Sequence, residues 1–163
     1  MRFYLAYGSN VSIARLGQRI AVAREWVNAL IVDRRLAFHK IGQDGSGKCD
    51  IPVHAGGVVH GVVYRLPADS LAVLDRIEGV GAGYRRKTLR VRLESGEEVS
   101  AETYVATAVD PRRRPFSWYL RHVLEGARAA GFPATYIDAL TAIESVRDPD
   151  AEREARELSI YHD

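Results

Sequence analysis

The stretch "LAYGSNVS", residues 5–12, joins a short apolar segment to a helix and sets the start of the fold. Residues 2–7 read as a strand. Ile13, Leu16 and Ile20 then follow at the spacing of one face of an amphipathic helix. A strand that runs into Gly-Ser-Asn and then a helix directs unpaired backbone N–H groups at one point. The turn is therefore a candidate anion site, and the alternative is an ordinary capped connection.

Further strands and helices can be placed outward from this turn. Residues 29–39 and 57–66 are rich in β-branched and aromatic residues, and residues 84–108 alternate around Ser95-Gly96 like a β-hairpin. Gly61 marks a bulge or a close backbone approach. The helices are expected at residues 68–77, 116–131, 134–146 and 150–160.

The segment from Ile41 to Gly57 shows neither a helical nor a strand period. It is rich in glycine and contains Pro52. A long segment of this kind inside a compact domain is often functional. We therefore expect a mobile loop that borders the site.

Length and composition favour one globular domain over residues 1–163, because 47% hydrophobic residues suffice for one core in a chain of this length. Strands far apart in sequence, with helices between and after them, indicate the α+β class. The first residues are too short an apolar run for a signal or a membrane span. A single cysteine, Cys49, fits a reducing compartment. The prediction is a cytoplasmic protein with no membrane partner.

Charge and motif spacing exclude several other functions. The net charge is only +2, and the cluster Arg112 to Arg114 lacks aromatic residues at base-stacking intervals. We expect no nucleic-acid partner, although nucleic-acid binding through these arginines is a rival interpretation. The histidines lack metal-ligand spacing, and the run "GVGAG" precedes a strand rather than a helix. The sequence thus predicts neither a metal nor a nucleotide.

Glu78 is the candidate for acid–base chemistry. Leu71, Leu74 and Glu78 share one face of the helix expected at residues 68–77. Burial of a carboxylate is costly, and the negative end of the helix dipole is near because Gly79 stops the helix. Both effects favour the protonated form, which suits a general acid or base. The alternative is a glutamate that extends into solvent from a frayed helix end.

The order of these elements resembles one known family. A Tyr-Gly-Ser-Asn turn is followed by "GVVHGVVYRL", "LAVLDRIEG" and a strand with a tyrosine, as in the γ-glutamylcyclotransferase family and its AIG2-like relatives. The resemblance runs from Phe3 to about Glu144. It implies a small mixed β-barrel surrounded by helices. It also implies cleavage of γ-glutamyl compounds, without a cofactor, into 5-oxoproline and a free amine or amino acid.

The resemblance also implies site residues. The catalytic glutamate falls on Glu78 in "LDRIEG", as general acid and base. The substrate-binding residues implied are Tyr7, Gly8, Ser9, Asn10, Val11, Ser12, Tyr84, Tyr104 and Tyr119. The tyrosines have an alternative interpretation as packing residues.

Several alternatives stay open. The small-molecule substrate can be a γ-glutamylamine, a γ-glutamyl dipeptide or a γ-glutamyl protecting group. A second interpretation is a non-catalytic module that binds a small molecule or a partner on the same fold; a carboxylate at position 78 argues against it. The sequence is also compatible with a homodimer.

Overall fold

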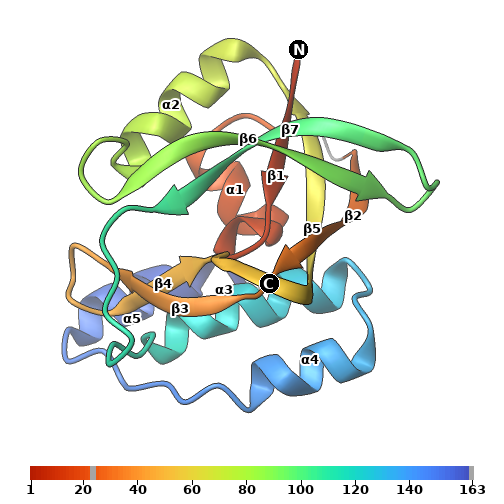
Figure 1. Ribbon diagram of the computed structural model, residues 1–163. Helices are drawn as coiled ribbons and strands as arrows, with labels where there is room; N and C mark the ends of the chain where they lie inside the picture. Colours follow the sequence, from red (N-terminus) through yellow and green to blue (C-terminus); the bar gives the residue numbers. More distant parts are fainter. Residues whose placement is uncertain (23–24, 162–163) are drawn as a thin grey trace.

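A closed five-stranded barrel forms the centre of the protein in this computed structural model, which describes residues 1–22 and 25–161. The strand order around the barrel is β1-β5-β2-β6-β7 (Figure 1). The predicted α+β fold with a small mixed barrel is confirmed. The barrel strands are β1 (Arg2–Ala6), β2 (Trp26–Arg34), β5 (Val53–Leu66), β6 (Tyr84–Leu93) and β7 (Glu98–Ala106).

The barrel closes where its first and last strands meet. β1 pairs with β5 in antiparallel register and with β7 in parallel register, through Tyr4 and Glu102. β5 is long enough to pair with both β1 and β2. Gly61 in β5 has the predicted close backbone approach, because a Cβ there would lie 2.7 Å from the carbonyl oxygen of Ala6.

The helices surround the barrel and carry its connections. Figure 1 shows α2 beside one end, while α3, α4 and α5 lie together below the other. In the described part of the chain, no helix is long and apolar enough to span a membrane. The helical segments are η1 (Ser9–Val11), α1 (Ile13–Arg19), α2 (Ala68–Glu78), α3 (Ser117–Ala129), α4 (Ala134–Thr141), α5 (Ala151–Leu158) and η2 (Ser159–Tyr161).

Apolar faces of helices and strands meet in one core. Leu71 and Leu74 of α2 are fully buried, as their spacing predicts, and so are Leu16 of α1 and Leu5 of β1. Complete burial of such a side chain stabilises the fold by roughly 1.5–3 kcal/mol. Because α1 and α2 both pack on this core, the end of α2 comes to lie beside the turn after β1.

The prediction of a mobile loop from Ile41 to Gly57 is wrong. Its residues form the end of β3 (Ala37–Ile41), all of β4 (Gly47–Asp50) and the start of β5. β3 and β4 pair as a separate hairpin. Gly45 turns the hairpin with φ +85°, and a Cβ at Gly47 would collide with the carbonyl oxygen of Phe38. The glycines that hide the strand period are thus required by close backbone packing.

The strand expected at residues 29–39 is also two strands rather than one. β2 ends at Arg34, with a register shift between Val32 and Arg34 and a left-handed Asp33 at φ +58°. The chain then leaves the barrel and continues as β3. The helix expected at residues 134–146 ends early, at Thr141.

Candidate active site

The turn after β1 presents backbone N–H groups at its first residues. Val11 N donates to Gly8 O and Ser12 N to Ser9 O, each at 3.2 Å, so these two groups are already used. The N–H groups of Gly8, Ser9 and Asn10 have no acceptor among the described residues. These three N–H groups are therefore the ones left for the anion binding that the sequence predicts, which stays a prediction.

Glu78 is the last residue of α2 and faces this turn. Its Oε1 accepts hydrogen bonds from Asn10 Nδ2 at 3.2 Å and Arg19 Nη1 at 3.1 Å. The side chain is 17% exposed, so it lies neither in the core nor free in solvent. The Arg19 guanidinium and the Glu78 carboxylate thus form a partly exposed ion pair.

An inner pocket at the end of the barrel contains most of the predicted site residues. The turn and Glu78 contribute to its walls, together with several tyrosines. The lining residues are Tyr4, Leu5, Tyr7, Gly8, Ser9, Asn10, Cys49, Glu78, Tyr84, Thr103, Tyr104 and Tyr119.

Each of the predicted pocket tyrosines also has a hydrogen-bond partner within the protein. Tyr7 Oη donates to Tyr104 O, and Tyr84 Oη donates to Cys49 O at 2.6 Å. Tyr119 Oη accepts from Cys49 N at 3.0 Å. Burial raises the pKa of Tyr7, Tyr84 and Tyr119 well above the ordinary value, so these hydroxyls stay neutral. The rings form an uncharged wall that the hydroxyl bonds hold in place.

Tyr104 is linked to α2. Its hydroxyl donates to Asp75 Oδ1 at 2.7 Å, one helical turn before Glu78. Burial and this carboxylate together raise the pKa of Tyr104. The bond fixes the distance between β7 and the helix that carries Glu78.

Val11 and Ser12 do not line the pocket, contrary to the sequence prediction. Ser12 Oγ accepts from Arg15 N at 3.4 Å as the N-cap of α1, and it lies 3.0 Å from Tyr161 Oη. A Cβ at Gly126 of α3 would collide with backbone atoms of Val11 and Ser12. These contacts place Val11 and Ser12 against α3 and the C-terminal segment.

Gly8 and Ser9 have roles that the sequence did not indicate. A Cβ at Gly8 would lie 2.8 Å from Cys49 Cβ, so the glycine permits close packing of the turn on β4. Ser9 Oγ accepts from Arg15 Nε at 3.1 Å and so has a cation beside it. Burial raises the pKa of Cys49 to about 12 and keeps it a thiol. Neither the Ser9 hydroxyl nor the Cys49 thiol has the activated form that a nucleophile needs.

Sequence reasoning missed Tyr4, Leu5, Cys49 and Thr103 in the pocket lining. Tyr4 Oη accepts from Asn10 Nδ2 at 2.9 Å, which places it one contact from Glu78. β1 precedes the recognised turn directly, so its residues could have been included. Cys49 gave no signal, because β4 was interpreted as part of a loop.

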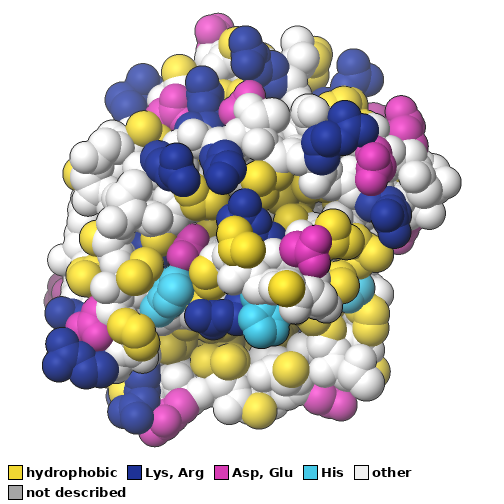
Figure 2. All heavy atoms as spheres, in the orientation of Figure 1, with side chains coloured by type: hydrophobic (Ala, Val, Ile, Leu, Met, Phe, Trp, Pro, Cys, Tyr) yellow, Lys and Arg dark blue, Asp and Glu magenta, His cyan; other side chains and the backbone are white. Residues whose placement is uncertain are grey.

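The inner pocket opens into an outer cleft that is rich in charged groups. Ser9, Glu78, Tyr84 and Tyr119 belong to both spaces. On the face of the molecule drawn in Figure 2, Lys and Arg side chains surround hydrophobic atoms between β6–β7 and the β3–β4 hairpin. The outer cleft is lined by Ser9, Arg15, Arg19, Lys40, Gly42, Gln43, Asp44, Lys48, Ile77, Glu78, Tyr84, Trp118, Tyr119, Arg153 and Glu157.

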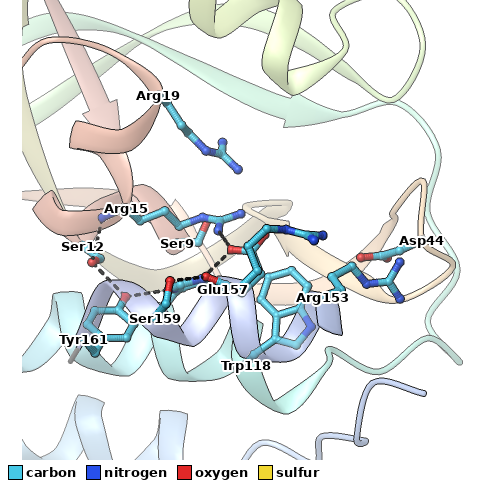
Figure 3. Close-up of polar contacts among 12 residues, drawn as sticks. Ser9, Ser12, Arg15, Arg19, Asp44, Trp118, Arg153, Glu157, Ser159 and Tyr161 are labelled. Carbon is cyan, nitrogen blue, oxygen red and sulfur yellow. Dashed lines mark hydrogen bonds and ion pairs between the residues drawn. The ribbon is translucent and has the colours of Figure 1, made fainter. Parts of the chain in front are cut away.

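The C-terminal segment fastens the turn from outside the barrel. Glu157 of α5 pairs with Arg15 Nη1 at 2.7 Å, and Figure 3 shows these side chains pointing toward each other. His122 lies 2.6 Å from Tyr161 Oη through Nδ1 and 3.1 Å from Glu157 Oε2 through Nε2. Because Arg15 bonds Ser9 and Tyr161 bonds Ser12, both ends of the turn are tied to this network.

The other charged clusters show no comparable organisation. Within residues 1–22 and 25–161, no group of three His, Cys, Asp or Glu side chains is arranged to hold a metal ion. Arg112 and Arg113 pair with Asp110, and Arg114 pairs with Glu144. These ion pairs partly neutralise the cluster that the sequence raised as a phosphate contact.

The barrel and its pocket bring one carboxylate, backbone N–H groups and neutral tyrosines together in one space. The model of the AIG2-like family matches residues 58–140. The human γ-glutamylcyclotransferase (Homo sapiens) is 30% identical over 151 residues, covering 86% of this chain and 78% of the human protein. The mouse γ-glutamylcyclotransferase (Mus musculus) is 31% identical over 147 residues, with the same coverage.

Solved structures agree with these sequence comparisons. A structure described as γ-glutamyl cyclotransferase superimposes with a TM-score of 0.85 and 27% sequence identity, covering 97% of this chain and 98% of that chain. The chain therefore belongs to the γ-glutamylcyclotransferase family, with its AIG2-like relatives. The prediction of an enzyme of this type is confirmed.

Proposed function

We propose that this protein cleaves γ-glutamyl amides by cyclisation, and that Glu78 transfers the proton. The observation that supports this most directly is the position of Glu78. It lies on the wall shared by the inner pocket and the outer cleft, where Asn10 and Arg19 hold its Oε1. No hydrogen bond from the described residues engages Oε2, which leaves that oxygen for a substrate.

The inner pocket accommodates the γ-glutamyl half of the substrate. Its α-carboxylate meets the free N–H groups of Gly8, Ser9 and Asn10, which suit an anion because they lie at a helical start. The chain of the glutamyl group then lies along the neutral tyrosine rings. This placement brings the α-amino nitrogen toward its own γ-carbonyl carbon and toward Glu78.

The reaction needs a base first and an acid afterwards. Glu78 takes a proton from the α-ammonium group, and the amine attacks the γ-carbonyl carbon to close a five-membered ring. The bond from that carbon to the leaving nitrogen then breaks, and Glu78 returns the proton to the departing amine. The ring nitrogen gives up its second surplus proton, and the released amine takes up a second proton as it becomes an ammonium ion, so two protons in all pass from the α-nitrogen to the leaving nitrogen. No water is consumed, and the products are 5-oxoproline and a free amine or amino acid.

Two effects supply the acceleration. Ring closure is intramolecular, so folding the substrate into the attacking conformation can supply several kcal/mol. Proton transfer by a positioned carboxylate adds about 10²- to 10⁴-fold in rate. The ion pair with Arg19 holds the Glu78 carboxylate in place during both transfers.

The finer sequence-based predictions belong to the same proposal. We propose that residues 1–163 act as one domain in the cytoplasm. The homodimer stays an open alternative. Sedimentation of the purified protein measures the oligomeric state directly.

Product analysis tests the proposed reaction. Wild-type protein is incubated with γ-glutamyl amino acids and γ-glutamylamines in water enriched in ¹⁸O, and the products are weighed by mass spectrometry. Cyclisation predicts 5-oxoproline without ¹⁸O. Glutamate that carries ¹⁸O would identify a hydrolase instead, and the absence of any product across the panel would favour the non-catalytic binding module.

A further inference from the structure

Lys40 is a buried cation in the outer cleft. The residue as a whole is only 7% exposed, and its Nζ lies 4.5 Å from the centre of the Tyr84 ring. Lys40 lines the outer cleft but not the inner pocket. The amino group thus lies next to the wall that the two spaces share, on the outer side of it.

The backbone around Lys40 is fixed on both sides. Lys40 pairs with Lys48 within the β3–β4 hairpin and forms a bridge with Val109 on its other edge. A Cβ at Gly83 would lie 2.9 Å from both Cε and Nζ of Lys40, so the glycine provides the space that the side chain occupies. The position of this amino group is therefore built into the fold.

Lys40 differs from the other cations of the cleft in its partners. Arg15 pairs with Glu157, Arg19 with Glu78, Lys48 with Asp44, and Arg153 with Asp148. For Lys40, the described residues offer no carboxylate within ion-pair distance.

An unpaired buried cation is costly for the free protein. Burial lowers the pKa of Lys40, and the more distant charges of Glu78 and Asp44 act in the opposite direction. An anion bound beside Nζ would offset the loss of hydration. The site therefore favours a ligand that brings a negative charge into the outer cleft.

We propose that Lys40 binds a carboxylate on the leaving group, which makes γ-glutamyl amino acids and peptides better substrates than γ-glutamylamines. This inference rests on the proposed function. Because Glu78 transfers a proton to the leaving nitrogen at the shared wall, the rest of the leaving group extends into the outer cleft. There Lys40 meets a carboxylate one or a few bonds from that nitrogen.

The test compares matched substrates. γ-Glutamylalanine carries the carboxylate, γ-glutamylalaninamide replaces it by a neutral group of similar size, and γ-glutamylethylamine lacks it. Initial rates of 5-oxoproline release give kcat/KM for wild type, Lys40→Met and Lys40→Arg. Lys87→Met, on β6 outside both spaces, controls for the loss of one lysine charge.

We expect wild type to prefer γ-glutamylalanine over its amide by about 10- to 100-fold, the range for a hydrogen bond to a charged partner. Lys40→Met should lose this preference through slower turnover of γ-glutamylalanine alone. Lys40→Arg should retain much of it, and Lys87→Met should behave as wild type. Lys40→Arg keeps the test valid if Lys40→Met does not fold.

Two results would overturn the assignment of Lys40. Equal wild-type kcat/KM for the acid and the amide would do so and would leave the proposed cyclisation intact. An equal loss on all three substrates in folded Lys40→Met would place the lysine on the γ-glutamyl half instead. No release from any substrate by wild type would instead reject the proposed function, and this inference with it.

Discussion

Asn10 positions Glu78 from the turn. Its Nδ2 donates both to Tyr4 Oη at 2.9 Å and to Glu78 Oε1 at 3.2 Å, so one amide group links β1, the turn and α2. A carboxylate that must exchange protons in one direction and then the other needs a fixed orientation. Asn10 is therefore a positioning residue.

Replacement of this amide tests that role. Asn10→Asp keeps the shape, but it replaces the donor by a carboxylate oxygen that repels Glu78. Loss of a hydrogen bond to a charged group predicts a fall in kcat of about 10- to 100-fold. Asn28→Asp is the matched control, because Asn28 Nδ2 donates a single hydrogen bond to Ala130 O away from the pocket. A wild-type kcat in Asn10→Asp would exclude the positioning role.

Gly8 gives a prediction about stability. Alanine at this position would place its Cβ 2.8 Å from Cys49 Cβ and 3.1 Å from Cys49 Sγ. Overpacking of this kind destabilises a fold by about 1–3 kcal/mol. Gly17→Ala is the control, since no atom lies within 4 Å of a Cβ there and alanine favours the helix. Thermal unfolding should show a lower Tm for Gly8→Ala and an unchanged or higher Tm for Gly17→Ala; equal values would remove the packing argument.

The sequence indicated Glu78 and the turn at residue level, but not how they are held. Glu78 is the next position on the apolar face of α2, and the resemblance of "LDRIEG" to the family motif named it. Its pairing with Arg19 joins residues 59 positions apart, which helical spacing does not report. Local spacing does not indicate the backbone hydrogen bonds of Cys49 either. Its N–H donates to Tyr119 Oη and its carbonyl oxygen accepts from Tyr84 Oη, and both bonds form only because β4, β6 and α3 meet in the fold.

Glu157 of the C-terminal segment and its partner His122 make stability depend on pH. Burial alone would raise the pKa of Glu157, but the hydrogen bond to His122 and the charge of Arg15 lower it to about 2 from an ordinary 4.5. Burial lowers the pKa of His122 below its ordinary 6.5. The unfolded chain therefore binds more protons than the folded one in both ranges. The contribution of these two groups to stability is complete above about pH 6.5 and falls as the solution becomes more acidic.

Glu157→Gln isolates one part of this dependence. The variant should be less stable than wild type at pH 7, and the difference should shrink between pH 4.5 and 2, where wild type loses its carboxylate charge. Urea unfolding across this range measures both free energies. Glu152→Gln, on an exposed position of α5, should follow wild type. A difference that stays constant with pH would show that the Glu157 charge does not stabilise the fold.

The β3–β4 hairpin shows where element prediction fails. Glycine-rich sequence was interpreted as a mobile loop, although Gly42, Gly45 and Gly47 serve a tight turn and a close strand approach. Those contacts are made with Phe38, Lys48 and the backbone near Arg113, so they are visible only in three dimensions. Strands with regular alternation, such as β6 and β7, were found correctly.

At the scale of the whole molecule, the strands could be predicted more readily than their closure. The barrel strands lie where apolar and β-branched segments were recognised, yet the contact that closes the ring joins Tyr4 to Glu102. No local sequence pattern indicates this parallel pairing, because the first and last strands of the barrel lie far apart in the sequence. The family resemblance supplied the barrel, and the physical pattern alone gave only the α+β class.

At the scale of the whole molecule, β1, α1 and α2 bring Glu78 beside the turn, and we propose that Glu78 moves a proton between two nitrogens of the substrate there. The most direct measurement is kcat for 5-oxoproline release by wild type and Glu78→Gln, after unfolding curves show that both are folded. Glutamine keeps the shape and cannot exchange the proton, so we expect a loss of about 10²- to 10⁴-fold. Equal kcat values for the two folded proteins would contradict the assignment of Glu78.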